Sequence, residues 1–195
     1  MLFSEMNRAF TGPKAYAEPD YDYLDRSARP EAETIRAVLE EWLEAYPNSD
    51  RADLIGRFTS PLDIHHLSAG FELYLYQLFL RLGYSVQVHP DSGPGKTTRP
   101  DFLLTDPDGC KLYVEAVQPS DVSAPDQGAQ ARLNVVYDTI NRMEVHGWFL
   151  GVESAGYPDV PPSARKLRSQ LKNWLESMNP DEVSASLEKN GRTDQ

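Results

Sequence analysis

The fold of this chain is decided by residues 99–115, whose sequence is RPDFLLTDPDGCKLYVE. Two runs of strand length, 101–105 and 111–117, flank the sequence DPDG, whose residues favour a tight turn. We therefore predict an antiparallel hairpin. A turn centred between Pro107 and Gly109 pairs residues whose numbers sum to about 215 or 216.

That register places two carboxylates, Asp101 and Glu115, opposite each other. Directly opposed residues share one face of the sheet, with Cβ atoms roughly 4.5–5.5 Å apart. Two anions at this distance repel unless one is protonated, a base lies between them, or a divalent cation binds both. Because Tyr113 and Val117 share the face of Glu115, we expect apolar surroundings for this acid rather than a wet face.

Helical spacing of apolar residues predicts the elements around the hairpin. The predicted helices cover Pro30 to Pro47, 68–83, 127–143 and 163–178, with a short helical turn near 52–58. Runs 85–89 and 147–152 are predicted as strands, whereas 1–29 is expected to be a loop-like arm and 179–195 a polar, frayed tail. This order predicts an α/β or α+β sheet covered by helices.

Glu72 is the one acid inside the apolar helix over 68–83. It lies nearer the apolar side formed by Leu75, Phe79 and Leu82 than the polar side. A glutamate at such a position needs a partner, and two interpretations are open. It either joins Asp101 and Glu115 at a site with oxygen ligands, which suits magnesium or manganese rather than zinc, or pairs with a backbone or basic group.

The amino-acid composition indicates the broad class of protein. The chain has 195 residues, of which 40% are hydrophobic and 25% charged, as expected for one compact globular domain, with or without a small appendage. Its net charge of −11 counts against wrapping of nucleic acid over a broad surface. The start has no signal-peptide core, no stretch is apolar enough to span a membrane, and the single Cys110 precludes an internal disulfide. We expect a cytoplasmic protein with no membrane partner.

Three stretches, 71–86, 99–104 and 113–116, together resemble the PD-(D/E)xK nuclease superfamily. The resemblance covers about residues 68–152 and implies the restriction-endonuclease-like fold, a mixed sheet with an αβββαβ core. An N-terminal helical extension and a C-terminal amphipathic helix would flank this core. The domain boundaries expected from the sequence are 1–63 for the arm and extension, 64–178 for the nuclease-like core, and 179–195 for the tail.

The resemblance also implies functional residues. Asp101 and Glu115 would bind Mg²⁺ or Mn²⁺, the carbonyl of Ala116 would be a further ligand, and Glu72 would support the metal. The chain departs from the family at the motif lysine, because Val117 occupies that position and cannot polarise a water molecule. The residues considered as substitutes for the lysine are Gln118, Lys96 and Arg99.

Two functional hypotheses from different classes follow. The first is a metal-dependent nuclease, or a nuclease-derived DNA-processing protein, that hydrolyses phosphodiester bonds; the second is a catalytically inactive nuclease-fold module that binds protein or nucleic acid. Whether the chain is an enzyme stays open at this point. If DNA or RNA is the partner, its phosphates are expected to meet a local basic face on the side of the carboxylates. That face comprises Lys96, Arg99, Arg165, Arg168 and Lys172.

Overall fold

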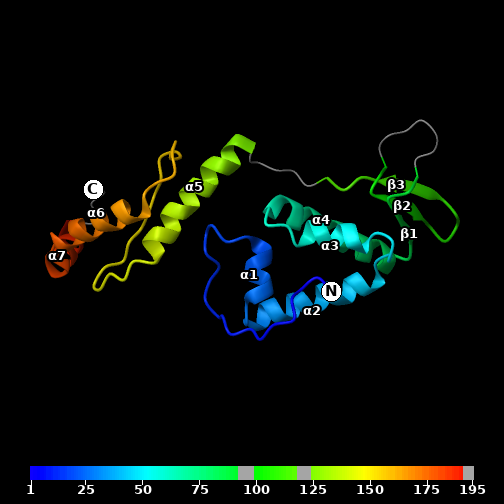
Figure 1. Cartoon of the computed structure of the whole chain (residues 1–195), viewed down its shortest axis with the longest axis horizontal. Helices are drawn as coiled ribbons and strands as arrows, with labels where there is room; N and C mark the ends of the chain where they lie inside the picture. The colour runs from blue at the N-terminus through cyan, green and yellow to red at the C-terminus, as the bar shows by residue number, and fades with distance from the viewer. Residues whose placement is uncertain (92–98, 118–123, 191–195) are drawn as a thin grey trace. The chain divides into compact units, whose positions relative to one another are not determined.

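The computed structural model describes residues 1–91, 99–117 and 124–190 (Figure 1). The chain divides into two compact units. Unit 1 comprises Met1–Lys14 and Glu18–Asp121, and unit 2 comprises Ala15–Ala17 and Val122–Gln195. The boundaries expected after residues 63 and 178 stay a prediction. Within the described residues, no helix is long and apolar enough to cross a membrane.

Four helices belong to unit 1: α1 (Asp20–Arg26), α2 (Pro30–Ala45), α3 (Arg51–Phe58) and α4 (Asp63–Arg81). The helices expected after Pro30 and around Gly70 are confirmed as α2 and α4. The N-terminal arm was expected to lack regular structure, and α1 corrects this expectation. Acidic residues in the first turn of α1 and Arg26 in its last turn complement the helix dipole, and Asp63 accepts a hydrogen bond of 2.7 Å from the backbone N–H of Asp20.

The sheet of unit 1 is antiparallel, with strands β1 (Ser85–Val88), β2 (Phe102–Thr105) and β3 (Lys111–Val114) in that order. Phe102 pairs with Val114 and Thr105 with Lys111, so the predicted hairpin and its register are confirmed. Gly109 has a φ of +87° at the turn, a backbone angle that favours glycine.

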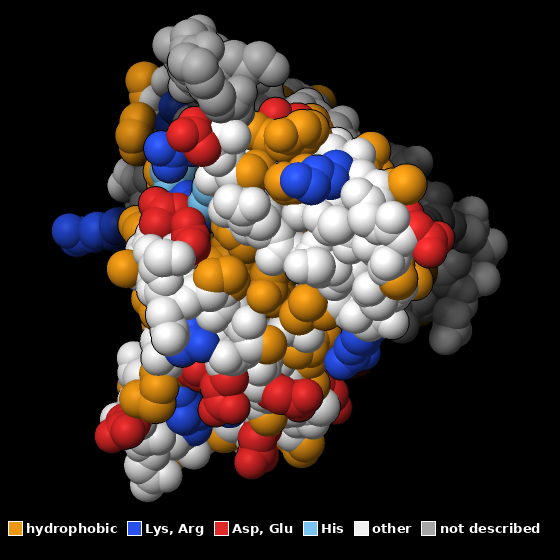
Figure 2. Space-filling view, turned by 90° about the vertical axis from the view of Figure 1, so that its right-hand side faces the viewer, with side chains coloured by type: hydrophobic (Ala, Val, Ile, Leu, Met, Phe, Trp, Pro, Cys, Tyr) orange, Lys and Arg blue, Asp and Glu red, His pale blue; other side chains and the backbone are white. Residues whose placement is uncertain are grey.

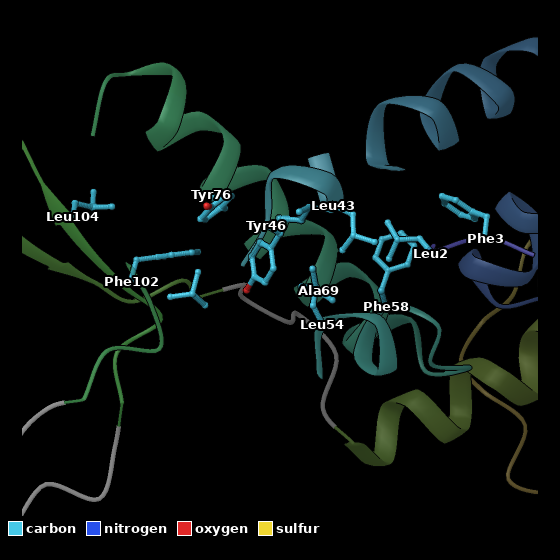
Figure 3. Packing of buried hydrophobic residues seen from close by; sticks show 12 residues of the cluster. Leu2, Phe3, Leu43, Tyr46, Leu54, Phe58, Ala69, Tyr76, Phe102 and Leu104 are labelled. Atoms are coloured by element: carbon cyan, nitrogen blue, oxygen red, sulfur yellow. The ribbon is translucent and has the colours of Figure 1, made fainter. Parts of the chain in front are cut away.

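The core of unit 1 joins the sheet to the helices. Figure 3 shows its buried side chains from Leu104 and Phe102 on the sheet, through Tyr46, to Phe58 and Phe3 near the N-terminus. The rings of Phe79 on α4 and Phe102 on β2 meet edge-on, with centroids 5.6 Å apart. Because burial of each large apolar side chain stabilises the fold by about 1.5–3 kcal/mol, this cluster holds β2 against α4.

Unit 2 contains α5 (Ala124–Asn141), α6 (Ala164–Glu176), α7 (Pro180–Asn190) and the short N-terminal segment 15–17. The carboxylate of Asp138 on α5 accepts hydrogen bonds from the backbone N–H groups of Tyr16 and Ala17, at 2.7 and 3.0 Å. The amide of Asn134, one helical turn earlier, donates to the carbonyl of Tyr16 at 2.9 Å. Segment 15–17 is thus clamped to α5 through its own backbone.

Two expectations for the C-terminal third are wrong. Residues 147–152 are not a strand, and Phe149 among them is 97% exposed. An apolar run becomes a strand only when a neighbouring strand pairs with it, and none of the described residues does so here. The polar tail forms α7 as far as Asn190, because Asn179 caps it by accepting from the N–H of Asp181.

The described residues therefore form a mixed α/β protein with seven helices and a three-stranded antiparallel sheet. The helix, three strands and following helix expected from the sequence are present in that order. The final strand of the expected αβββαβ core is absent from the part of the chain that the structure describes.

Candidate functional site

The sequence-predicted carboxylates lie at the end of the hairpin opposite its turn. Asp101 directly precedes β2 and Glu115 directly follows β3, so the register of the two strands, continued by one residue, sets them across from each other. Oδ2 of Asp101 accepts a hydrogen bond of 2.6 Å from the backbone N–H of Ala116. This bond fixes the Asp101 carboxylate beside the chain segment that carries Glu115.

The surroundings of Glu115 differ from the expectation. Glu115 is exposed, and its neighbours on the same face, Tyr113 and Val117, are 58% and 75% exposed. The expectation of an apolar environment is wrong because β3 is an edge strand and none of the described elements covers this face. Glu115 has no hydrogen-bond or ion-pair partner among the described residues, which leaves its carboxylate accessible to a ligand.

Glu72 is 5% exposed and lies in a polar network of unit 1. Its Oε1 accepts a hydrogen bond from the hydroxyl of Tyr46, and its Oε2 lies 2.7 Å from Nη2 of Arg57. Of the two interpretations left open by the sequence, the structure shows pairing with a basic group. Both carboxylate oxygens of Glu72 have protein partners.

The protonation states of this network follow from its packing. Burial, together with the hydrogen bond to Glu72, raises the pKa of Tyr46 far above its usual value, so the hydroxyl keeps its proton and donates. Burial lowers the pKa of Arg57, but the charges and hydrogen bonds of Glu72 and Asp53 together outweigh burial and raise it overall. The network thus contains a carboxylate paired with a permanent cation and a neutral phenol.

His89 links this network to the hairpin end. Its Nε2 lies 3.8 Å from Oε1 of Glu72, and its Nδ1 lies 3.4 Å from Oδ1 of Asp50. Its backbone N–H donates to the carbonyl of Asp101 at 2.9 Å, and its φ of 42° is the one positive value among the described residues other than glycine. Contacts therefore run without interruption from Glu72 through His89 and Asp101 to Ala116.

Sequence reasoning missed three members of this arrangement: Tyr46, Arg57 and His89. Tyr46 and Glu72 are 26 residues apart in the chain, so no helical or strand periodicity relates them. The only local signal was a histidine at the end of a strand next to Pro90, which is more often structural. Tertiary packing of α2, α3 and β1 against α4 brings these side chains together.

The residues at the hairpin end fit a hydrated magnesium ion in part. Mg²⁺ commonly binds through one or two carboxylates and keeps several water molecules. Asp101 engages one carboxylate oxygen with Ala116, and Glu115 is free among the described residues, so these two acids suit such binding. Glu72 does not, because both its oxygens are engaged. The described part of the chain contains no group of three or more His, Cys, Asp or Glu side chains arranged to hold a metal ion.

The candidate basic residues are distributed over both units. Gln118 and Lys96 lie outside the described residues, and Arg99 is exposed in unit 1. Arg165, Arg168 and Lys172 are exposed on α6 of unit 2, where Lys172 lies 3.7 Å from Glu176. On the face shown in Figure 2, acidic side chains gather toward the bottom, whereas basic ones are scattered. A shared basic face next to the carboxylates remains a prediction.

Comparison with protein-family models, with curated proteins and with solved structures found no significant match to this chain. The resemblance to the PD-(D/E)xK superfamily therefore rests on the residues quoted above alone.

Proposed function

We propose that this chain is a metal-dependent nuclease, or a nuclease-derived DNA-processing protein, of the restriction-endonuclease-like fold. Asp101 and Glu115 would bind Mg²⁺ or Mn²⁺, with the carbonyl of Ala116 as a further ligand. The observation that carries the proposal is the hairpin register, which sets Asp101 across from Glu115 and ties it to Ala116 by a hydrogen bond of 2.6 Å.

A divalent cation bound here would supply Lewis-acid chemistry, lowering the pKa of a water molecule and neutralising charge that develops on a phosphodiester. The protein's part is to hold the ligands in place. The backbone N–H of His89 donates a hydrogen bond to the carbonyl of Asp101, and the backbone N–H of Ala116 donates one to its carboxylate. Glu115 offers an accessible carboxylate on the opposite strand. In this arrangement Glu72 would not bind the metal ion. It would help to position the hairpin end through its contact with His89.

Val117 occupies the position that the motif lysine has in the family. Val117 is 75% exposed and carries no polar atom in its side chain. Among the described residues, Arg99 is the cation nearest in sequence to Asp101, and it is exposed. We propose that Arg99, Lys96 or Gln118 takes the role that the lysine has in the family.

The second candidate is a catalytically inactive module that keeps this fold to bind protein or nucleic acid. Two observations favour it: Val117 stands at the lysine position, and both oxygens of Glu72 are engaged by Tyr46 and Arg57. The two candidates differ in whether metal binding is followed by cleavage.

Calorimetric titration with MgCl₂ and MnCl₂ tests the metal site, and incubation with single- and double-stranded DNA and RNA tests cleavage. We expect the wild type to bind metal, and Asp101→Asn and Glu115→Gln to weaken binding at least tenfold. Glu153→Gln, which alters an exposed acid of unit 2, is the matched control and is expected to bind as the wild type does.

Metal binding without cleavage of any substrate would favour the inactive module. Absence of metal binding by the wild type, or equal binding by Asp101→Asn, would overturn the metal site. Cleavage that persists unchanged in Glu115→Gln would place the catalytic residues elsewhere.

A further inference from the structure

Unit 2 contains a cavity that the proposed site does not use. Its volume is about 490 Å³, within the range of small-molecule sites in proteins. Tyr16, the C-terminal end of α5 and six residues between 143 and 152 line it. Four of the lining side chains are aromatic: Tyr16, Tyr137, Trp148 and Phe149. All its lining residues belong to unit 2.

The aromatic wall is partly held in place by the clamp on α5. Asp138 and Asn134 fix the backbone of segment 15–17, and the ring of Tyr16 then lies 5.0 Å from that of Tyr137, measured between centroids. The hydroxyl of Tyr137 pairs with that of Ser154 at 3.2 Å, which orients its ring. Two aromatic side chains of the cavity therefore have defined positions before any ligand arrives.

Other rings and one amide are available to a ligand. Phe149 is 97% exposed and has no ring contact among the described residues. Asn141 lines the cavity and is exposed, and its amide offers both donors and an acceptor. Flat aromatic faces beside one amide match a planar heterocycle that stacks on its faces and hydrogen-bonds at its edge.

Positive charge lies on α6, which packs against α5 in the same unit. Arg165, Lys166, Arg168 and Lys172 are all exposed, and the sequence has no acid from Val160 to Leu175. Charges beyond about 10 Å are largely screened at 0.1 M salt, so a phosphate bound along α6 would meet this local excess of positive charge rather than the net charge of −11. A planar base carrying a phosphate chain is complementary to both features.

We propose that unit 2 binds single-stranded nucleic acid, with an unpaired base stacked in the cavity of Tyr16, Tyr137, Trp148 and Phe149 and the phosphates following α6. A base held in a duplex is stacked on both faces and cannot enter, so the site selects unpaired strands. The inference rests on the proposed function for its ligand class, and it specifies that class as single-stranded rather than double-stranded.

Fluorescence anisotropy in EDTA tests the inference without the metal site. The probes are a labelled 12-nucleotide DNA strand, the same strand with abasic residues throughout, and its duplex. We expect the wild type to bind the base-containing strand at least tenfold more tightly than the abasic strand, and the duplex more weakly than the single strand.

Substitutions distinguish the contribution of base stacking to binding from the contribution of positive charge. Phe149→Ala is expected to weaken binding of the base-containing strand by about fivefold or more and to leave the abasic strand unchanged. Val160→Ala, an exposed apolar change outside the cavity, is the matched control. Arg168→Gln with Lys172→Gln is expected to weaken both strands and reduce the salt dependence of binding. Circular dichroism of each variant confirms its fold.

Equal affinity for the base-containing and abasic strands, tighter binding of the duplex, unchanged binding by Phe149→Ala, or no binding of any strand would each overturn the inference. Because EDTA removes the cation, these outcomes are independent of the calorimetric test at Asp101 and Glu115. Strand binding with no metal binding would refute the proposed metal site alone, and metal binding with no strand binding would refute the cavity alone.

Discussion

The two units use their aromatic residues differently. Unit 1 has aromatic side chains at the centre of its core: Tyr46, Phe58 and Phe102 are at most 1% exposed, whereas Tyr74 and Tyr113 lie at its surface. Unit 2 has aromatic side chains at its surface, with Phe149 97% and Trp174 52% exposed. Its buried hydrophobic residues among those described are smaller, namely Ala129, Leu133 and Leu175.

This difference indicates separate roles for the two sets of aromatic side chains. In unit 1 they contribute to stability, because removing a buried ring leaves a cavity. In unit 2 they contribute little to stability and remain available for contact with a ligand. The same substitution should therefore have large effects on stability in unit 1 and small ones in unit 2.

The largest expected effect is at Glu72. Glu72→Ala removes the partner of the Tyr46 hydroxyl and of the Arg57 guanidinium, so we expect the free energy of unfolding to fall by about 3 kcal/mol or more. Urea denaturation measures this change. Glu153→Ala, at an exposed acid of unit 2, is the control and should change stability by less than about 0.5 kcal/mol. Equal effects of the two substitutions would remove the contrast between the units.

A smaller loss is expected at the hairpin end. Asp101→Ala leaves the N–H of Ala116 without its acceptor, which should lower the free energy of unfolding by about 1–3 kcal/mol. Asp101→Asn keeps an oxygen that can accept this hydrogen bond, so it should lower the free energy of unfolding by less. Thermal unfolding without metal compares the two variants. If Asp101→Ala melts above the wild type, repulsion with Glu115 outweighs the hydrogen bond.

Because of Tyr46, the stability of unit 1 is expected to depend on pH in the alkaline range. Burial and Glu72 raise its pKa in the folded state, so the unfolded chain releases the phenolic proton first, near pH 10. The stabilisation is complete below that pH and falls as the pH rises above it, by up to about 1.4 kcal/mol per pH unit. Urea denaturation at pH 9, 10 and 11 should show a shallower decline for Tyr46→Phe. Parallel declines would contradict the assigned shift.

The smallest effect is expected at Phe149 of unit 2. Because the side chain is 97% exposed, Phe149→Ala should alter the free energy of unfolding by no more than about 0.5 kcal/mol. Phe58→Ala in unit 1, where the ring is 1% exposed, is the matched comparison and should cost about 3–5 kcal/mol. A loss above 1 kcal/mol for Phe149→Ala would show that this ring packs within the fold.

The parts of the structure that the sequence predicts are those fixed by neighbouring residues. The turn DPDG sets the register of β2 and β3, and thereby the opposition of Asp101 and Glu115. The spacing of apolar residues likewise predicts α2 and α4. Local sequence patterns cannot predict that Glu72 pairs with Arg57 or that residues 147–152 form no strand. Each of these features depends on which distant segment of the chain packs next to the residues concerned. The same holds for Glu115, whose exposure follows from β3 being an edge strand.

The clamp on segment 15–17 has a consequence for the order of events during synthesis. Tyr16 and Asp138 are 122 residues apart, so their bond closes one of the longest loops in the chain. At about 5–20 residues per second, the ribosome adds Asp138 about one to three seconds after Asp121, the last residue of unit 1. Unit 1 therefore has time to fold while Tyr16 still lacks its partner, and the N-terminal segment joins α5 as a late step of biogenesis.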